Sequence, residues 1–247
     1  MSPDLELALR LADAADAIAL PAFRTGGLVV ETKPDLTPVT EADRAVEAEL
    51  RRLLAAERPD DALLGEEDGA TGSGRRRWLI DPIDGTRNYT RGIPVWATLV
   101  ALEDEGIVRV GAVSAPALER RWWAERGAGA FADGVPMRVS RVERVEFAVL
   151  SFAFEGPLPE VAHRAWHARG FGDFWAHMLV AEGAVDGAVD AEGIREWDLA
   201  AVQVIVEEAG GRFSDLSGAA RIDGGTAVTS NGLLHDELLR ALAKPST

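Results

Sequence analysis

The residues best suited to chemistry lie in the stretch from Trp78 to Tyr89, which reads WLIDPIDGTRNY. An apolar run ends there in Asp81, and Asp84 follows three residues later. Two carboxylates at the end of a strand offer the hard oxygen ligands that Mg²⁺ prefers. The alternative is an Asp-Pro turn followed by an Asp-Gly turn, because both pairs are common in ordinary loops.

The residues around these two aspartates favour a ligand site. Pro82 restricts the backbone between them, Gly85 lets the backbone approach a ligand closely, and Thr86 adds a hydroxyl. We therefore expect Asp81 and Asp84 to be held in a preset geometry at a strand end.

Three further acidic clusters stand at expected strand ends or helix starts. They are Glu66 and Glu67 in residues 63–69, Asp198 in residues 196–211, and Asp43 in residues 39–44. Each has a structural alternative: a solvated loop for the two glutamates, a first-turn helix acid for Asp198, and a capping box with Thr40 for Asp43. Buried carboxylates that repel one another are costly. If the four clusters converge, two or three divalent cations would offset that repulsion.

The elements that must position these residues follow from hydrophobic spacing. Helices are expected over residues 2–23 and, after a cap at Thr40, over residues that include Val46, Leu50 and Leu54. Strands are then expected at 62–64, 77–80, 96–102, 108–113 and 121–124. Beyond residue 145 we expect strands at 148–152, 186–190, 212–214 and 227–230 alternating with helices at 159–169, 173–184, 198–209 and 233–243. This pattern predicts an α+β lobe over 1–144 and an α/β lobe over 145–247, packed tightly as one unit.

Composition excludes several classes of function. The 247 residues include 26 basic and 41 acidic side chains, a formal charge of −15, which disfavours nucleic acid and acidic lipid as partners. The chain has no cysteine, so it has neither disulfides nor thiolate ligands. No stretch suits a signal peptide or a membrane span, which predicts a soluble, cytoplasmic protein.

Two minor patterns are given structural interpretations. His163 and His167 lie four residues apart, but without a HExxH motif we expect them on the solvated face of a helix rather than at zinc. The run Arg75 to Arg77 is too short for nucleic acid and is expected in a solvated loop.

The motifs GEE, WLIDPIDGTRNY and EWDLAAVQVIVEEAGG resemble, in order and spacing, those of the inositol monophosphatase superfamily. More closely, TKPDLTPVTEADRAVE, NYTRGIPVWATLVAL, VSAPALERRWWAERGAGAFADG, FGDFWAHMLVAEGAVD and TSNGLLHDELL are similar to the histidinol-phosphate phosphatases of that superfamily. The resemblance spans nearly the whole chain. It is weakest over residues 140–170, and Tyr89 stands where phenylalanine is common.

The resemblance implies a layered αβαβα sandwich, two or three Mg²⁺ ions per subunit, and usually a homodimer. It implies a ligand set of Glu66, Asp81, the carbonyl of Ile83, Asp84 and Asp198, with Asp43 near the most weakly bound metal and Glu67 alongside. The implied activity is hydrolysis of a phosphate monoester by metal-activated water. We expect Glu66, Thr86 and Asp84 to be catalytic, and the amides of Gly85 and Thr86 to bind the phosphate.

Substrate specificity must lie outside these shared residues. Asp173 and Glu192 are extra carboxylates that would favour a cationic substrate, and L-histidinol phosphate carries an ammonium and an imidazole. The alternative for Asp173 is a helix cap. Arg91, Asn231 and Asp236 are further candidate contacts, within one subunit or across a dimer interface. The competing functions are an inositol-1-phosphate or broad sugar-phosphate phosphatase and a non-catalytic, metal-dependent scaffold.

Overall fold

Two long helices form the first layer of the molecule. A computed structural model of the chain describes residues 1–25, 30–32, 38–153 and 158–243, so residues 33–37 of the proline-rich stretch lie outside the described residues. Helix α1 spans Pro3–Thr25 and begins where the Leu5 amide donates to Ser2 Oγ at 3.2 Å. Helix α2 spans Glu41–Glu57 and begins at the predicted capping box of Thr40 and Asp43.

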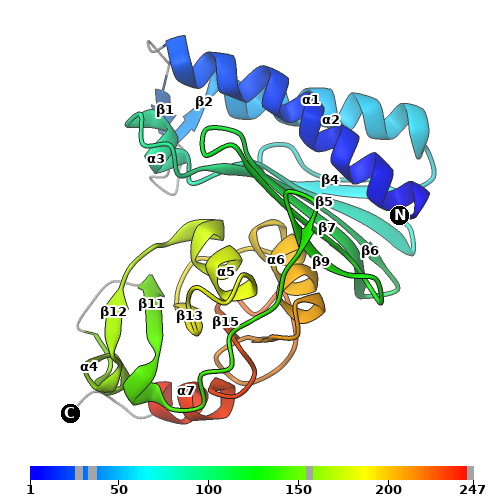
Figure 1. The fold of residues 1–247 in the computed structure, drawn as a ribbon. Coiled ribbons are helices and arrows are strands. Elements are labelled where there is room, and N and C mark those ends of the chain that lie inside the picture. The colour runs from blue at the N-terminus through cyan, green and yellow to red at the C-terminus, as the bar shows by residue number, and fades with distance from the viewer. Residues whose placement is uncertain (26–29, 33–37, 154–157, 244–247) are drawn as a thin grey trace.

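The second layer is an eight-stranded sheet whose face toward α1 and α2 is apolar (Figure 1). Its strands are β3 (Ala62–Gly65), β4 (Gly69–Thr71), β5 (Arg76–Asp84), β6 (Ala97–Asp104), β7 (Ile107–Ala115), β8 (Arg120–Glu125), β9 (Gly129–Ala132) and β10 (Val135–Pro136). The order across the sheet is β10-β9-β8-β7-β6-β5-β3-β4. Among the described strands of this sheet, only β3 and β5 pair in parallel, so both end at the same edge, where the short helix α3 (Thr86–Thr90) follows β5.

The third layer holds helices α5 (Asp173–Ala181) and α6 (Glu196–Glu208), which pack on the opposite face of the same sheet. Close contact depends on Gly111 of β7, because a Cβ there would lie 2.7 Å from Val204 Cγ1 and 2.9 Å from Ala201 Cα. This contact joins the two halves of the chain. It also positions the first turn of α6 relative to the end of β5.

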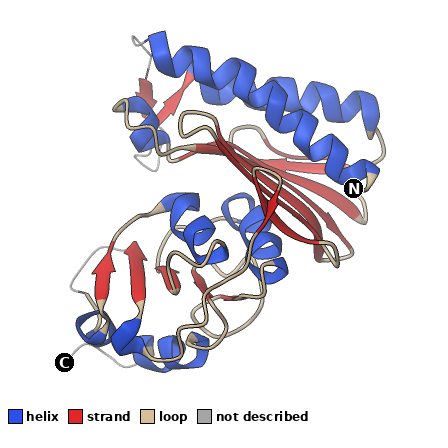
Figure 2. Ribbon diagram, in the orientation of Figure 1, coloured by secondary structure: helices blue, strands red, loops and turns tan. Residues whose placement is uncertain are grey.

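The fourth and fifth layers complete the structure (Figure 2). A five-stranded sheet contains β11 (Val149–Ala153), β12 (His167–Arg169), β13 (Gly187–Asp190), β14 (Arg212–Ser214) and β15 (Ala227–Ser230), in the order β12-β11-β13-β15-β14. Helices α4 (Glu160–Arg164) and α7 (His235–Leu242) pack with it in a separate apolar cluster. The remaining short elements are β1 (Val30–Thr32), its partner β2 (Pro38–Thr40), and the 3-10 turn η1 (Val145–Phe147). The predicted αβαβα layering is therefore confirmed.

Two local predictions are wrong. The helix expected over 159–169 ends at Arg164, and His167 begins strand β12, which pairs in parallel with β11; His163 and His167 thus lie on different elements. Arg76 belongs to strand β5 rather than to a loop and pairs with Asp61, whereas Arg77 lies in the strand predicted over 77–80 and pairs with Glu103. In both cases strand pairing with distant residues decided the structure.

No helix in the described ranges has the length and apolar character needed to cross a bilayer.

Candidate active site

A β-bulge in β5 brings two aspartates to the same side of the sheet edge. Successive side chains of a regular strand alternate between faces, so residues 81 and 84 would point apart. The pairing of β5 with β6 shifts register between Asp81 and Asp84, and the Thr98 hydroxyl donates to the Pro82 carbonyl at 2.7 Å within the bulge. Asp81 in turn accepts the Ile83 amide at 3.0 Å, which fixes its carboxylate.

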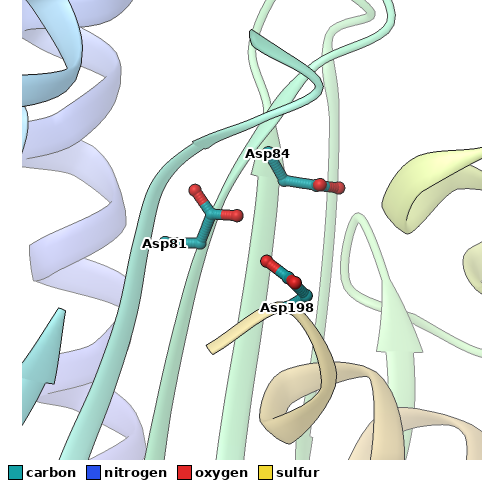
Figure 3. Close-up of side chains that lie close together, drawn as sticks. All are labelled: Asp81, Asp84 and Asp198. Atoms are coloured by element: carbon teal, nitrogen blue, oxygen red, sulfur yellow. The ribbon is translucent and has the colours of Figure 1, made fainter. Parts of the chain in front are cut away.

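Asp198 completes the cluster from the other half of the chain (Figure 3). It lies in the first turn of α6, where its Oδ2 accepts the Arg195 amide at 2.7 Å. One carboxylate oxygen from each of Asp81, Asp84 and Asp198 lies within 4.8 Å of the other two. Asp198 can therefore stabilise the start of the helix and serve as a ligand. One of its oxygens accepts the Arg195 amide at the start of α6, while the side chain faces the other two aspartates.

The three carboxylates destabilise one another when all are charged. Burial raises the pKa of Asp81 well above its usual range, and the charges of Glu66 and Asp84 raise it further. Burial likewise raises the pKa of Asp84, together with the charges of Asp173 and Asp198. Burial raises the pKa of Asp198 to about 7. No lysine or arginine pairs with any of the three among the described residues, so a divalent cation suits the donor set.

Glu66 reaches the same edge from the loop after β3. Its amide donates to the Ile80 carbonyl at 3.2 Å, and its side chain lines the cavity beside Asp81. The next residue, Glu67, is not among the lining residues; its amide donates to Glu47 Oε2 at 2.7 Å. Glu47 is fully buried on α2 and also pairs with Arg51, so α2 holds this loop in place.

Asp43 lies behind the cluster rather than on the cavity wall. Its Oδ2 accepts the Thr40 amide at 2.8 Å, while its Oδ1 is 3.4 Å from Thr86 Oγ1. The Thr86 hydroxyl also lies 2.9 Å from the Ile83 carbonyl. The side chain of Asp43 is fully buried, and burial raises its pKa. The capping role of Asp43 is confirmed, and its Oδ1 contacts Thr86, which lines the cavity.

Gly85 is needed where β5 ends and α3 begins. Its φ is +82°, a value that favours glycine, and a Cβ would lie 3.0 Å from the Val95 carbonyl and 3.4 Å from Asp173 Oδ2. Helix α3 begins at Thr86.

Two connected cavities meet at these residues. The first, of about 380 Å³, is lined by Glu66, Asp81, Ile83, Asp84, Gly85, Thr86, Arg87, Asn88, Asp173 and Asp198. The second, of about 560 Å³, is lined by Asp84, Arg87, Ala153, Asp173, Phe174, Asp190, Glu192, Gly193, Ile194, Asp198 and Leu199. We call them the metal cavity and the acidic cavity. They share Asp84, Arg87, Asp173 and Asp198, so a ligand can occupy both.

Asp173 and Glu192, the two predicted specificity residues, both line the acidic cavity. Asp173 does not cap α5 through its side chain; Gly172 occupies that position, and Asp173 Oδ2 accepts from Asn88 Nδ2 at 3.1 Å. Asp173 has φ +48°, a strained value for a non-glycine residue and one that recurs at functional sites. Burial and the charge of Asp190 raise the pKa of Asp173 to about 6.

Three polar lining residues were missed from the sequence: Arg87, Asn88 and Asp190. Arg87 and Asn88 lie within the motif WLIDPIDGTRNY, directly after the predicted Thr86, so their position was the available signal. Asp190 is the last residue of a short buried strand that was predicted over 186–190, so the available signal was a carboxylate at a strand end.

Three other candidates do not line either cavity. Arg91 is exposed at the end of α3. Asn231 is buried and donates to Ser140 Oγ and to the Val142 carbonyl, while Asp236 pairs with Arg212 on the surface. Within one subunit these contacts are structural, and any role toward substrate stays a prediction.

Comparison with known proteins decides the family. The profile of the inositol monophosphatase family matches residues 1–246. The chain belongs to the inositol monophosphatase family. It is 52% identical to a histidinol-phosphatase of Mycobacterium tuberculosis over 97% of both chains, and 48% identical to a histidinol-phosphatase of Streptomyces coelicolor over 96% of this chain and 95% of that one.

A solved structure shares the whole architecture. The extragenic suppressor protein suhB from Bartonella henselae superposes with a TM-score of 0.91 at 29% identity, covering 99% of this chain and 100% of that one. The present chain, as a member of this family, is a phosphomonoesterase. Small phosphate esters suit its site. The family is metal-dependent, and Asp81, Asp84 and Asp198 form an acidic cluster that could bind metal.

Proposed function

We propose that the protein is a Mg²⁺-dependent phosphatase that hydrolyses L-histidinol phosphate to L-histidinol and phosphate, a step of histidine biosynthesis. The observation that carries the choice of substrate is the lining of the acidic cavity. Asp173, Asp190 and Glu192 line it against one basic side chain, Arg87. An ammonium and an imidazole fit such a wall better than the neutral hydroxyls of an inositol do. The names of the two bacterial relatives support the same choice.

The metal cavity supplies the hydrolytic half of the proposal. Asp81, Asp84 and Asp198 would hold two or three Mg²⁺ ions together with Glu66 and the Ile83 carbonyl, with Asp43 near the weakest site. Bound Mg²⁺ would supply positive charge to the phosphate oxygens and lower the pKa of a bound water well below its value in bulk water. The amides of Gly85 and Thr86 and the Arg87 side chain, which belong to the lining of the same cavity, would bind and orient the phosphate.

Glu66 and Thr86 are the proposed partners of the attacking water. The Thr86 hydroxyl can donate to the Ile83 carbonyl 2.9 Å away, which leaves its oxygen free to accept a hydrogen bond from water. Glu66 lines the same cavity, and its carboxylate can take the proton. The water oxygen then bonds to phosphorus while the bond from phosphorus to the ester oxygen breaks. The leaving alkoxide takes a proton from solvent water, and Glu66 returns the proton it accepted to solvent.

The test is phosphate release from L-histidinol phosphate, inositol-1-phosphate, fructose-1,6-bisphosphate and 3′-phosphoadenosine-5′-phosphate, each with Mg²⁺ and with EDTA. We expect strong preference for L-histidinol phosphate and loss of release in EDTA. Preference for inositol-1-phosphate would overturn the substrate while keeping the chemistry. Absence of release from every ester would favour the non-catalytic alternative. The homodimer and the cytoplasmic location stay predictions, which light scattering and cell fractionation would test.

A further inference from the structure

Helix α6 is tied to the first sheet by an arginine–glutamate pair near each of its ends. In its first turn, Glu196 accepts hydrogen bonds from Arg77 of β5. In its last turn, Glu207 accepts from Arg126, the residue after β8, at 2.5 Å. Asp198 lies two positions after Glu196, whereas it is roughly 13 Å along the helix axis from Glu207. Only the pair in the first turn is therefore placed to act on the metal cavity.

Arg77 and Asp81 project from the same face of β5. Side chains two and four residues apart in a regular strand share a face, and the pairing with β6 is regular from residue 77 to residue 81. Leu79, between them, packs in the apolar cluster that α5 and α6 form with this face. Arg77 thus holds the start of α6 against the strand that carries Asp81.

The Arg77 guanidinium connects three elements. Its Nη2 donates to Glu196 Oε1 at 2.9 Å and to Glu103 Oε2 of β6 at 2.9 Å, and its Nη1 donates to Glu196 Oε2 at 3.4 Å. Each of the three side chains is less than one-third exposed. A planar guanidinium that contacts both oxygens of a carboxylate fixes the direction of the carboxylate as well as its distance.

The start of α6 lacks the usual side-chain cap. Arg195 occupies the N-cap position, and its side chain makes no capping hydrogen bond. Its amide is held by Asp198 Oδ2, which belongs to the acidic cluster itself. Asp81 and Asp84 lie on β5, so a shift of the helix start away from the sheet would relieve their repulsion with Asp198. A tie from outside the cluster is needed to resist that shift.

We infer that Arg77 is a positioning residue for the metal cavity. Its forked contact with Glu196 keeps Asp198 within reach of Asp81 and Asp84 against their mutual repulsion. Arg77 lines neither cavity, so it acts only through α6. The inference rests on the proposed function, because it concerns the cluster that would hold Mg²⁺.

The first experiment measures metal binding without substrate. Arg77→Met removes the fork and keeps most of the length of the side chain. Isothermal titration calorimetry of the metal-free protein with Mg²⁺ gives the dissociation constant, which should rise roughly tenfold or more. The loss of a positive charge near the cavity would by itself tighten cation binding, so the two effects have opposite signs. An unchanged or lower dissociation constant would overturn the inference.

The matched control is Arg126→Met, which breaks the pair at the other end of α6. Arg77 and Arg126 are similarly exposed, at 28% and 30%. Thermal unfolding shows how far each variant loosens the fold. We expect weaker Mg²⁺ binding in Arg77→Met alone. An equal rise of the dissociation constant in both variants would show general loosening of the helix and would overturn the inference.

Arg77→Lys decides the question if Arg77→Met does not fold. A lysine keeps the charge but offers one ammonium in place of the fork, so a change in Mg²⁺ binding reports geometry alone. The dissociation constant should rise severalfold, while kcat at saturating Mg²⁺ stays close to the wild-type value. Mg²⁺ binding as tight as in the wild type would overturn the inference.

The outcomes for Arg77 and for the proposed function can be told apart. If the wild-type protein binds no Mg²⁺, the inference and the proposed function both fail. If the wild-type protein binds Mg²⁺ and Arg77→Met binds it as tightly, only the inference about Arg77 fails.

Discussion

The metal cavity and the acidic cavity share one wall but are built in different ways. Most of the metal cavity comes from a continuous stretch, residues 81–88, at the end of β5. The acidic cavity takes its side chains from separate segments: the ends of β11 and β13, the start of α5, and the loop before α6. The residues that we propose to act on the phosphate are thus close together in the sequence, whereas those that we propose to contact the leaving group are brought together by the fold.

This difference explains how one family can keep its chemistry and change its substrate. A substitution at Asp190 or Glu192 alters the leaving-group wall without moving the bulge that holds Asp81 and Asp84. Substitutions in residues 81–86 affect every phosphate ester alike. The comparison therefore predicts two different effects on activity. Substitutions confined to the acidic cavity should change the preference among esters, whereas substitutions in the metal cavity should affect all esters alike.

The largest expected effect is at the metal cavity. Asp84→Asn should lower kcat by on the order of 10³-fold for L-histidinol phosphate and for any slower ester alike, because a ligand shared by all substrates is lost. The melting temperature in EDTA should not fall, since the substitution removes a charge that its neighbours repel. Steady-state kinetics on two esters and thermal unfolding check both points. A fall in kcat for only one of the two esters would contradict the proposed difference between the two cavities.

An intermediate effect is expected behind the Glu66 loop. Buried Glu47 accepts the amides of Glu67 and Asp68 at 2.7 and 2.9 Å, and residue 65 must be glycine because a Cβ would lie 2.4 Å from Glu47 Oε1. Glu47→Gln should raise the Mg²⁺ concentration for half-maximal activity roughly 10-fold or more, with little change in ester selectivity.

The matched control for that variant is Glu49→Gln, on the same helix but paired with Arg52 at the surface. It should leave the Mg²⁺ dependence unaltered. A change in selectivity without a change in Mg²⁺ dependence in Glu47→Gln would contradict the assigned role.

The smallest expected effect is a pH dependence of the metal-free protein. Burial raises the pKa of Asp198 from 3.8 to about 7, so between these values the folded chain binds a proton that the unfolded chain does not. The unfolding free energy in EDTA should therefore rise as pH falls from 7 toward 4. Asp198→Asn should remove part of this pH dependence. The part removed corresponds to roughly 2–4 °C in melting temperature, after allowance for the partial exposure of Asp198.

Saturating Mg²⁺ should suppress the same slope, because cation and proton compete for the carboxylate. Thermal melts at several pH values, with Mg²⁺ and with EDTA, measure it. A wild-type slope in EDTA equal to that of Asp198→Asn would show that Asp198 does not take up the proton.

Local patterns predicted a large part of this molecule because they depend on near neighbours. The Thr40 and Asp43 capping box, the apolar face of α2 and the alternating strands of the first sheet all follow from spacing along the chain. Prediction failed at residues 167–169, where an edge strand forms only because β11 lies beside it. A three-residue segment has too little local preference to resist such pairing.

The sequence by itself determined the phosphate end: two aspartates, a glycine and a threonine within six residues, and an acidic residue at the start of a later helix. Only the tertiary structure decided that Asp198 meets Asp81 and Asp84, since that contact depends on α6 packing against Gly111 of the sheet. The same holds for Asp190, whose hydrogen-bond partner His177 lies on another element. Side-chain pairs that span layers carry no period along the chain, so only the assembled layers reveal them.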